Sequence, residues 1–304
     1  MIGPSSYPMN LKRFTQNPLI FPELHPSIGE NINGPSLIRV PDWLPNPLGR
    51  YYLYFGHHQG TFIRLAYADR VEGPWKIYSP GTLRVEETRC SGHIASPDVH
   101  IDHASRQVRM YFHGPVRHAP EVNEPNPEAA GQYSFVARSQ DGIHFEPGRE
   151  ILGAPYFRVF QWQGHTYALG MPGIFYRTRD GLTEFERGPV LFSRAMRHTA
   201  VQIVGSTLFV YYSNAGDCPE RILYSSIDLR PDWHSWKATP PMEVLAPETA
   251  YEGMDLPPLA SVRGWAPQRV RQLRDPGIFE EDGRTVLLYS VAGEAGIAAA
   301  EIIA

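Results

Sequence analysis

Short apolar runs separated by turns recur five times along the chain. Each copy contains a run rich in tyrosine, phenylalanine and leucine that ends in small or polar residues. These runs cover residues 50–56, 108–114, 165–170, 207–213 and 284–290. Runs of this composition, bounded by turn residues, are typical of β-strands. The pattern therefore predicts an all-β protein built from a repeated unit.

Two further runs flank each copy and complete the repeated unit. The preceding runs cover residues 34–40, 96–101, 154–159, 198–203 and 275–279, and the following runs cover residues 62–68, 133–139, 173–178, 221–226 and 296–302. A meander of three or four strands that recurs five times is the signature of a five-bladed β-propeller.

The repeats favour a single domain over residues 1–304, because no linker separates them. The expected blades span approximately residues 34–80, 94–148, 154–190, 197–240 and 274–304. The chain stops after the third strand of the fifth blade, so we expect the N-terminal segment, around residues 11–19, to supply a fourth strand. This strand would close the ring and leave no open edge.

Composition and charge exclude several classes of protein. The 304 residues are 42% hydrophobic and 20% charged, as in ordinary globular proteins. The net charge of −4 and the lack of a basic run argue against nucleic acid or an anionic membrane as a partner. Cys90 and Cys218 form no disulfide framework or metal motif, so we expect free thiols. No run resembles a signal peptide or a membrane span, which predicts a cytoplasmic protein.

The innermost strands of a propeller line its axis, so their first residues should crowd around one mouth. Aligning the strand starts places Gly34, Asp98, Tyr156, His198 and Asp275 at equivalent positions. A carboxylate buried at such a place is costly unless it has partners or a function. Asp98 and Asp275 are therefore candidate catalytic residues. The long connection over residues 246–272 and the insert over residues 118–131 are candidate lids or binding loops.

Histidines are unusually frequent near the expected mouth. Together with nearby polar residues they form the predicted substrate-binding set: Asn33, His57, His58, His93, His113, Arg158, His198 and Arg274. Imidazoles supply acid and base groups that titrate near neutral pH. With a carboxylate they could also bind a divalent metal at the axis, but no spacing matches a zinc motif. The sequence therefore requires no cofactor.

Three segments at strand starts resemble phrases of the five-bladed propeller glycosidases. Gly-Pro-Ser-Leu-Ile-Arg-Val at residues 34–40 resembles the first-blade Asp-Pro-Ser-Ile-Ile-Arg of the arabinanase/xylosidase group, and Ser-Pro-Asp-Val at residues 96–99 resembles its Ala-Pro-Asp-Val. Arg-Asp-Pro at residues 274–276 is similar to that phrase in the invertase/levansucrase group. The resemblance implies that Asp98 tunes the acid and orients the substrate. It also implies that Asp275 grips sugar hydroxyls and steadies the transition state.

Two positions depart from the resemblance. Gly34 stands where the arabinanase/xylosidase group has its general base, and Gly153 stands where that group has its general-acid glutamate. Glu252, in the long connection before the fifth blade, is the predicted replacement acid. Asp255 and Glu294 are further carboxylates in loops at the expected mouth.

The resulting hypothesis is a glycoside hydrolase-like enzyme that acts on a small carbohydrate or oligosaccharide in the axial funnel. Asp98, Asp275 and Glu252 would be its catalytic residues, and the separation of two carboxyl groups would indicate retention or inversion. The scheme fails if Asp98 and Asp275 lie at opposite ends of the axis. Two alternatives stay open: a metal- or histidine-dependent enzyme of lyase type, and a non-catalytic sugar-binding propeller.

Overall fold

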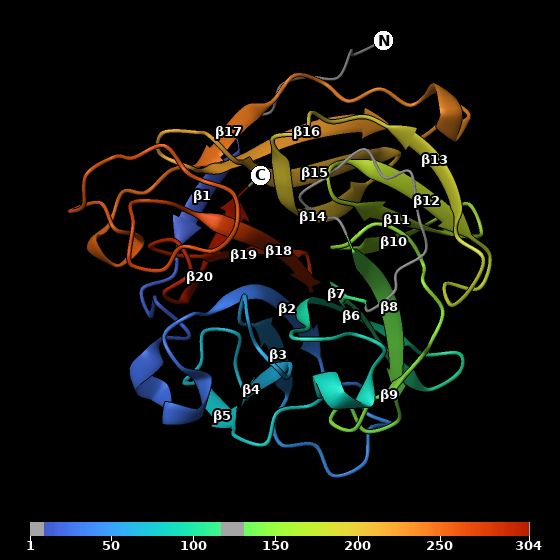
Figure 1. Ribbon diagram of the computed structural model, residues 1–304, viewed down its shortest axis with the longest axis horizontal. Coiled ribbons are helices and arrows are strands. Elements are labelled where there is room, and N and C mark those ends of the chain that lie inside the picture. The colour runs from blue at the N-terminus through green and yellow to red at the C-terminus, as the bar shows by residue number, and fades with distance from the viewer. Residues whose placement is uncertain (1–8, 117–130, 304) are drawn as a thin grey trace.

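Five antiparallel sheets of four strands stand around a central axis as the blades of a propeller (Figure 1). This arrangement is seen in a computed structural model that describes residues 9–116 and 131–303. The predicted all-β, five-bladed β-propeller is confirmed. Within the described residues, none of the helical segments has the length and apolarity of a membrane span.

Each blade follows the chain from the axis outwards. Blade one contains β2 (Asn33–Arg39), β3 (Tyr51–Gly56), β4 (Arg64–Ala68) and β5 (Lys76–Tyr78); blade two contains β6 (Ala95–Asp102), β7 (Gln107–Pro115), β8 (Gln132–Ser139) and β9 (Glu146–Pro147). Blade three contains β10 (Arg158–Trp162), β11 (His165–Gly170), β12 (Ile174–Thr178) and β13 (Glu186–Val190). Blade four contains β14 (Met196–Val204), β15 (Thr207–Asn214), β16 (Ile222–Asp228) and β17 (Met242–Leu245). Blade five contains β18 (Arg274–Glu281), β19 (Arg284–Ser290), β20 (Ile297–Ile303) and β1 (Asn10–Arg13).

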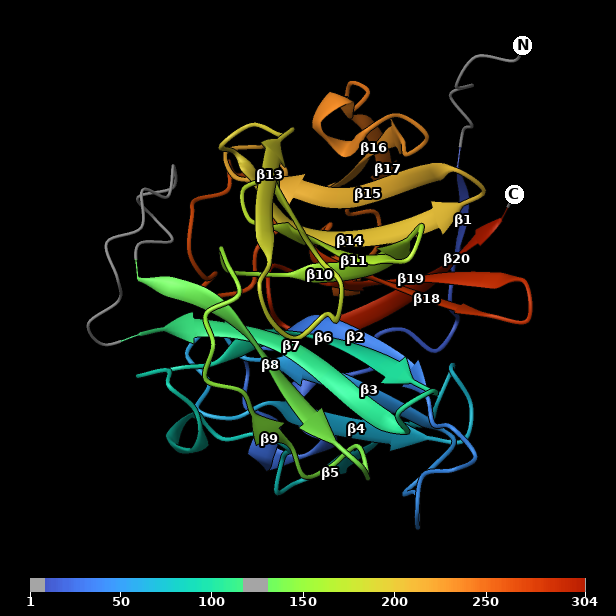
Figure 2. The same cartoon turned by 90° about the vertical axis from the view of Figure 1, so that its right-hand side faces the viewer.

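The N-terminal strand closes the ring, as the sequence predicts. β1 pairs antiparallel with β20, with Asn10 opposite Ile303 and Arg13 opposite Ala300. Both views place β1 alongside β20 (Figure 1 and Figure 2). The fifth blade is therefore made from both ends of the described chain, and β1 pairs the edge of β20 that would otherwise be open.

Apolar side chains fill the spaces between neighbouring blades. Separate buried clusters lie between blades one and two, two and three, three and four, four and five, and five and one. Every residue of β3 is buried because its blade has a neighbour on each face. This packing explains why the second strands read as continuous apolar runs and not as strict alternation.

The inner strands begin with a common irregularity. The register against the second strand slips in blades one, two, four and five at the start of the inner strand. One residue at each start has a left-handed backbone: Gly34, Ser96, Tyr156, His198 and Asp275, with φ between 47° and 67°. The blade-two member is Ser96, so the alignment that placed Asp98 there is wrong. The register shift lies between Ala95 and Asp98, and from Asp98 onwards the pairing is regular.

The long connection over residues 246–272 lies over the mouth formed by these strand starts. The carbonyl oxygen of Gly264 accepts hydrogen bonds from Nη1 of Arg197 and Nη1 of Arg274, each at 3.2 Å. Arg263 donates to the carbonyl oxygen of Arg194. The predicted insert over residues 118–131 lies outside the described residues, except for Gly131.

Candidate active site

Four of the five left-handed strand starts carry side chains that line one cavity at the mouth of the axis. This cavity, the axial pocket, has a volume of about 260 Å³. It is lined by Asn33, His58, His93, Ala95, Ser96, His113, Gln132, Tyr156, Met171, Arg197, His198, Arg263, Gly264 and Asp275. A left-handed backbone is strained for residues other than glycine and occurs preferentially at functional sites.

Asp275 is the one carboxylate among the described residues that line the axial pocket. Its Oδ1 accepts a hydrogen bond from the Tyr156 hydroxyl at 2.7 Å. Its Oδ2 lies 3.7 Å from Nδ1 of His198, and neither atom has a hydrogen-bond partner in the described part of the chain. Burial, together with the negative charge of Glu294, raises the pKa of Asp275 to about 6. The carboxyl group can therefore hold or release a proton near neutral pH.

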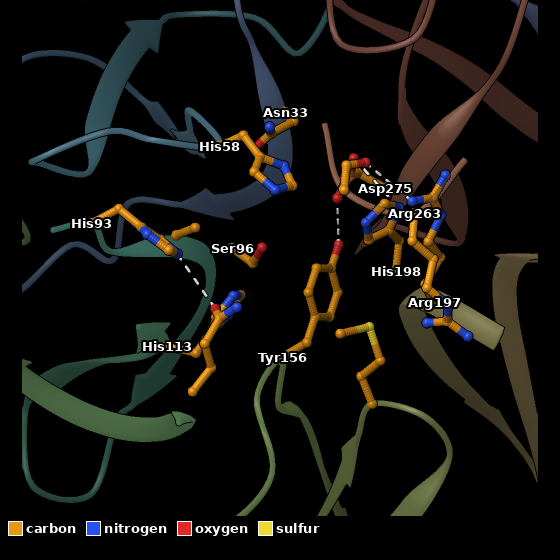
Figure 3. A pocket seen from close by; sticks show the side chains of 14 residues that line it. Asn33, His58, His93, Ser96, His113, Tyr156, Arg197, His198, Arg263 and Asp275 are labelled. Atoms are coloured by element: carbon orange, nitrogen blue, oxygen red, sulfur yellow. Dashed lines mark hydrogen bonds and ion pairs between the residues drawn. The ribbon is translucent and has the colours of Figure 1, made fainter. Parts of the chain in front are cut away.

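The buried histidines of the pocket are held neutral. Burial, with the positive charge of Arg197, lowers the pKa of His198 well below its usual value. Burial also lowers the pKa values of His113 and His93. Figure 3 shows His58, His93 and His113 on one side of the hollow and Asp275 and His198 on the other, with Tyr156 between them. The pocket thus sets the neutral imidazoles of His93 and His113 opposite a titrating carboxyl group.

A buried chain of alternating charges supports Asp275 from behind. Arg274 contacts Glu220 at 3.1 Å and Glu294 at 2.9 Å, and Arg197 also pairs with Glu220. Burial opposes ionisation of Glu294, but contacts with His58, Arg274 and Asn31 outweigh it and lower the pKa of Glu294 to about 2. The positive charges of the two arginines cancel the negative charges of the two glutamates, so the cluster is neutral when Asp275 is protonated. This balance agrees with the raised pKa of Asp275.

The structure gathers most of the predicted binding residues and excludes three. Asn33, His58, His93, His113 and His198 line the axial pocket with Asp275, whereas His57, Arg158 and Arg274 do not. His57 faces a neighbouring hollow. Arg274 is buried in the charge network beside the pocket, where it supports Asp275 and makes no contact with the pocket lumen.

Arg158 also differs from its expected role, because it closes the axis below the pocket. Only 3% of this residue is exposed. From blade three, its Nη1 donates to the carbonyl oxygen of Ser96 in blade two at 3.1 Å, and its Nε donates to that of Thr199 in blade four at 2.8 Å. Its guanidinium lies 4.3 Å from the centre of the Tyr156 ring. Arg158 and Tyr156 therefore form the floor of the axial pocket.

Asp98 lies on the other side of this floor, which corrects the expected pairing with Asp275. It lines a separate cavity of about 340 Å³ with residues further along the inner strands. Its Oδ2 accepts hydrogen bonds from His100 at 2.8 Å and from the backbone of Val159 at 2.7 Å. Burial opposes ionisation of Asp98, but His100 and Arg158 outweigh it and lower its pKa. The scheme that joins Asp98 and Asp275 in one site therefore fails.

Glu252 is also outside the axial pocket, so its assignment as the acid is corrected. Its side chain is completely buried and pairs with Arg13 of β1 at 2.8 Å. It also accepts hydrogen bonds from the Tyr289 hydroxyl at 2.9 Å and from the backbone of Glu248 at 2.7 Å. These contacts satisfy the carboxylate and fix the N-terminal strand, which leaves Glu252 no access to a substrate.

Several lining residues were not proposed from the sequence. Tyr156 was recognised only as a strand start, and Met171, Gln132 and Arg263 carried no motif. The sequence does carry a signal for Tyr156, because its segment aligns with that of Asp275 at the start of an inner strand once Ser96 replaces Asp98. Arg263 lies in the long connection, outside the repeated strands, and the folding of that connection brings it to the pocket.

The described residues contain no group of three or more histidine, cysteine, aspartate or glutamate side chains that could hold a metal ion. Cys90 and Cys218 are both free thiols, as the sequence predicts. The lining of the axial pocket supplies one carboxyl group, four imidazoles, a tyrosine and two arginines.

Comparisons with solved structures show the same propeller in carbohydrate-active enzymes. One is CoXyl43, a GH43 β-xylosidase/α-arabinofuranosidase from a compost microbial metagenome, in complex with xylotriose. It is 13% identical, with a TM-score of 0.62, and the match covers 96% of this chain and 95% of that one. At this identity the likeness establishes the fold alone.

A second similar structure comes from the GH130 family of mannoside phosphorylases, which contains glycoside hydrolases that target β-1,2 mannosidic linkages in Candida mannan. It is 12% identical, with a TM-score of 0.67, and the match covers 99% of this chain and 95% of that one. The architecture of this chain is therefore shared with two families of glycosidases.

Sequence comparison gives a nearer relative. No family model matches the chain. The uncharacterized protein R118 of Acanthamoeba polyphaga mimivirus is 37% identical over 306 aligned residues, which cover 90% of this chain and 83% of that protein. The chain, whose structure is a five-bladed β-propeller, therefore belongs to the family of the mimivirus protein R118.

Proposed function

We propose that the protein cleaves a glycosidic bond in the axial pocket and that Asp275 is the general acid. The observation that carries the proposal is the carboxyl group of Asp275. Its Oδ2 has no hydrogen-bond partner among the described residues, and its pKa of about 6 allows it to be protonated near neutral pH. A general acid with a raised pKa is what cleavage of a glycosidic bond requires.

The reaction follows from the placement of the groups. Asp275 gives its proton to the glycosidic oxygen as the bond to the anomeric carbon breaks. A water molecule adds to that carbon and passes a proton to a neutral imidazole, for which His113 on the opposite side of the hollow is the candidate. The imidazolium proton then returns to the Asp275 carboxylate through solvent, which restores the starting state.

We expect this reaction to invert the anomeric configuration. A retaining glycosidase needs a second carboxylate as a nucleophile about 5–5.5 Å from the acid. In the part of the chain that is described, no other carboxylate lines the axial pocket. Direct attack by water is the route that remains, and NMR of the released sugar in deuterated buffer would show the inverted anomer first.

The shared fold gives the first substrates to test. Of the similar proteins, CoXyl43 is a β-xylosidase/α-arabinofuranosidase that binds xylotriose, and the GH130 family contains hydrolases that target β-1,2 mannosidic linkages. A panel of p-nitrophenyl xyloside, arabinofuranoside and mannoside, with xylotriose and β-1,2-mannobiose, samples these classes. His93, Ser96 and Gln132 line the pocket with polar groups that could bind sugar hydroxyls.

The central test is Asp275→Asn, which keeps the shape of the side chain and removes its acidic proton. We expect kcat on the best substrate of the panel to fall by about 10²–10⁴-fold. Asp255→Asn is the matched control, because Asp255 is an exposed aspartate in the connection over the mouth. Equal loss in both variants, or none in Asp275→Asn, would refute the role of Asp275.

The pH profile gives an independent test of the same role. An acid must be protonated to act, so kcat/KM should fall as the pH rises above about 6, the pKa of Asp275. If Asp275 acted as a base, activity would instead fall below that pH. Sugar binding without turnover would favour the non-catalytic propeller, and activity lost to a chelator would favour the metal-dependent enzyme.

A further inference from the structure

A second and larger hollow adjoins the axial pocket between blades one and five. This outer hollow has a volume of about 820 Å³. Its walls come from the N-terminal segment at Phe21, the blade-one loop at His57, the long connection at Trp265 and the blade-five loop at Ala295. No residue of the catalytic scheme above lies in it.

The two hollows share a wall made of residues that are adjacent or nearly adjacent in sequence. His58 lines the axial pocket and its neighbour His57 lines the outer hollow. Likewise, Gly264 lines the axial pocket and Trp265 lines the outer hollow. Across this wall, Nδ2 of Asn33 in the axial pocket donates to Oδ1 of Asn31 in the outer hollow at 3.1 Å. The two hollows therefore lie side by side, on opposite faces of this wall.

The lining of the outer hollow suits a sugar chain. Phe21, Tyr251 and Trp265 supply aromatic surface, and Trp265 is 38% exposed. Exposed polar side chains, including Gln59 and Gln268, stand at its rim. Sugar rings present an apolar C–H face that packs on aromatic rings and hydroxyl groups that bond to polar side chains.

The floor of the axial pocket fixes the direction of such a chain. Arg158 bonds to the carbonyl oxygens of Ser96 and Thr199 and so spans the axis beneath Tyr156. A chain cannot continue through this floor, so the axial pocket admits only a terminal unit. The rest of the chain must leave through the mouth.

We propose that the outer hollow binds the sugar units beyond the bond that is cleaved, so that the substrate is an oligosaccharide of at least three units from which one terminal sugar is removed. This inference rests on the proposed function for the identity of the axial pocket. The volumes of about 260 and 820 Å³ fit one ring at the axis and several beyond it. Trp265 is the expected stacking platform.

Chain-length dependence tests the proposal. Xylo-oligosaccharides and β-1,2-manno-oligosaccharides of two to six units are assayed for turnover, and their binding to Asp275→Asn is measured by calorimetry. We expect affinity and kcat/KM to rise up to at least three units, with one monosaccharide released per event. Trp265→Ala should lower the ratio of tetrasaccharide to disaccharide kcat/KM about tenfold, whereas the control Leu259→Ala, an exposed apolar residue of the same connection, should leave that ratio unchanged.

The outcomes separate this inference from the proposed function. Cleavage of a p-nitrophenyl glycoside without any gain from longer chains, or internal cleavage of a chain, would overturn the inference alone. Chain-length-dependent binding that Trp265→Ala weakens, without turnover by the wild type, would support the outer hollow and overturn the proposed function. Failure of every oligosaccharide to bind would overturn the inference.

Discussion

At the scale of single residues, the backbone conformation of the strand starts decides which side chains reach the axis. Ser96, Tyr156, His198 and Asp275 all have positive φ, which residues other than glycine rarely adopt. The repetition of this conformation brings one side chain from each of four blades to a common hollow. The residue types differ from blade to blade, so a regular scaffold produces an asymmetric site.

Gly34 is the one member of this set without a side chain, and the structure gives the reason. Its φ is +61°, and a Cβ atom would lie 3.1 Å from Cα of Ser96. Gly205 has the same φ but nothing within 4 Å of a Cβ atom. Gly205→Ala should therefore cost only the conformational term, about 1 kcal/mol. Gly34→Ala should cost more, because Ser96 must also move, and urea denaturation of the two variants would measure the difference.

The same crowding bears on the missing general base. Gly34→Asp places a carboxylate where the resembling glycosidases carry theirs, but its Cβ atom would lie 3.1 Å from Cα of Ser96, so Ser96 must shift to accommodate it. We expect this variant to be less stable than the wild type and no more active. A gain in activity would show that the site can accept the familiar arrangement of acid and base.

At the scale of elements, one short strand carries the closure of the ring. β1 is held to blade five by four paired residues and to the long connection by the ion pair of Arg13 and Glu252. Glu252 is fully buried, so its carboxylate depends on Arg13 and on the hydroxyl of Tyr289. The connection that covers the mouth and the strand that closes the ring are therefore fastened at the same point.

Removing the charge of Glu252 should loosen this point. Glu252→Gln leaves Arg13 without its buried partner, and breaking one side of such a pair costs about 3–5 kcal/mol. Glu248→Gln is a sharp control: Glu248 pairs with the same arginine, but its side chain is 65% exposed, and exposed pairs contribute less than about 1 kcal/mol. Thermal unfolding should separate the variants clearly, and equal melting temperatures would contradict the structural role.

The elements were largely predictable from the sequence, whereas the site was only partly so. Apolar runs and turns are local signals, and they gave the five blades and the closing strand. Asp275, His113 and His198 followed from their places at strand ends. The position of Asp98 could not be predicted, because a shift of two residues along an inner strand places a side chain on the other side of the floor made by Arg158. The position of Glu252 could not be predicted either, because its partner Arg13 lies 239 residues away. Neither feature leaves a local pattern.

At the scale of the whole molecule, the buried histidines make stability depend on pH. His113 and His198 stay neutral in the fold because their pKa values are lowered, whereas in the unfolded chain they take up protons near pH 6.5. Their contribution to the free energy of unfolding is fully present above pH 6.5 and is lost as the pH falls below it. Asp275 acts in the opposite sense between about pH 6 and 4, because the folded state holds its proton more tightly.

The lowered pKa values of His57, His93, His113 and His198 outweigh the raised pKa of Asp275, so we expect net destabilisation as the pH falls from 7.5 to 5. His113→Gln should reduce this loss, because one of the neutral imidazoles is removed. His103→Gln, at an exposed histidine outside the axial pocket, is the control. Urea denaturation of each protein at both pH values measures the loss, and a slope unchanged in His113→Gln would contradict the assignment.

Arg158 bridges blades two, three and four, so the axial pocket opens only at its mouth. A sugar freed against the floor would lie beneath the remainder of its chain, so the shortened chain would have to depart first. Product release would then be ordered. The aromatic contacts that help a long chain to bind would also delay the escape of the freed sugar. Tighter binding of the chain would therefore lower kcat.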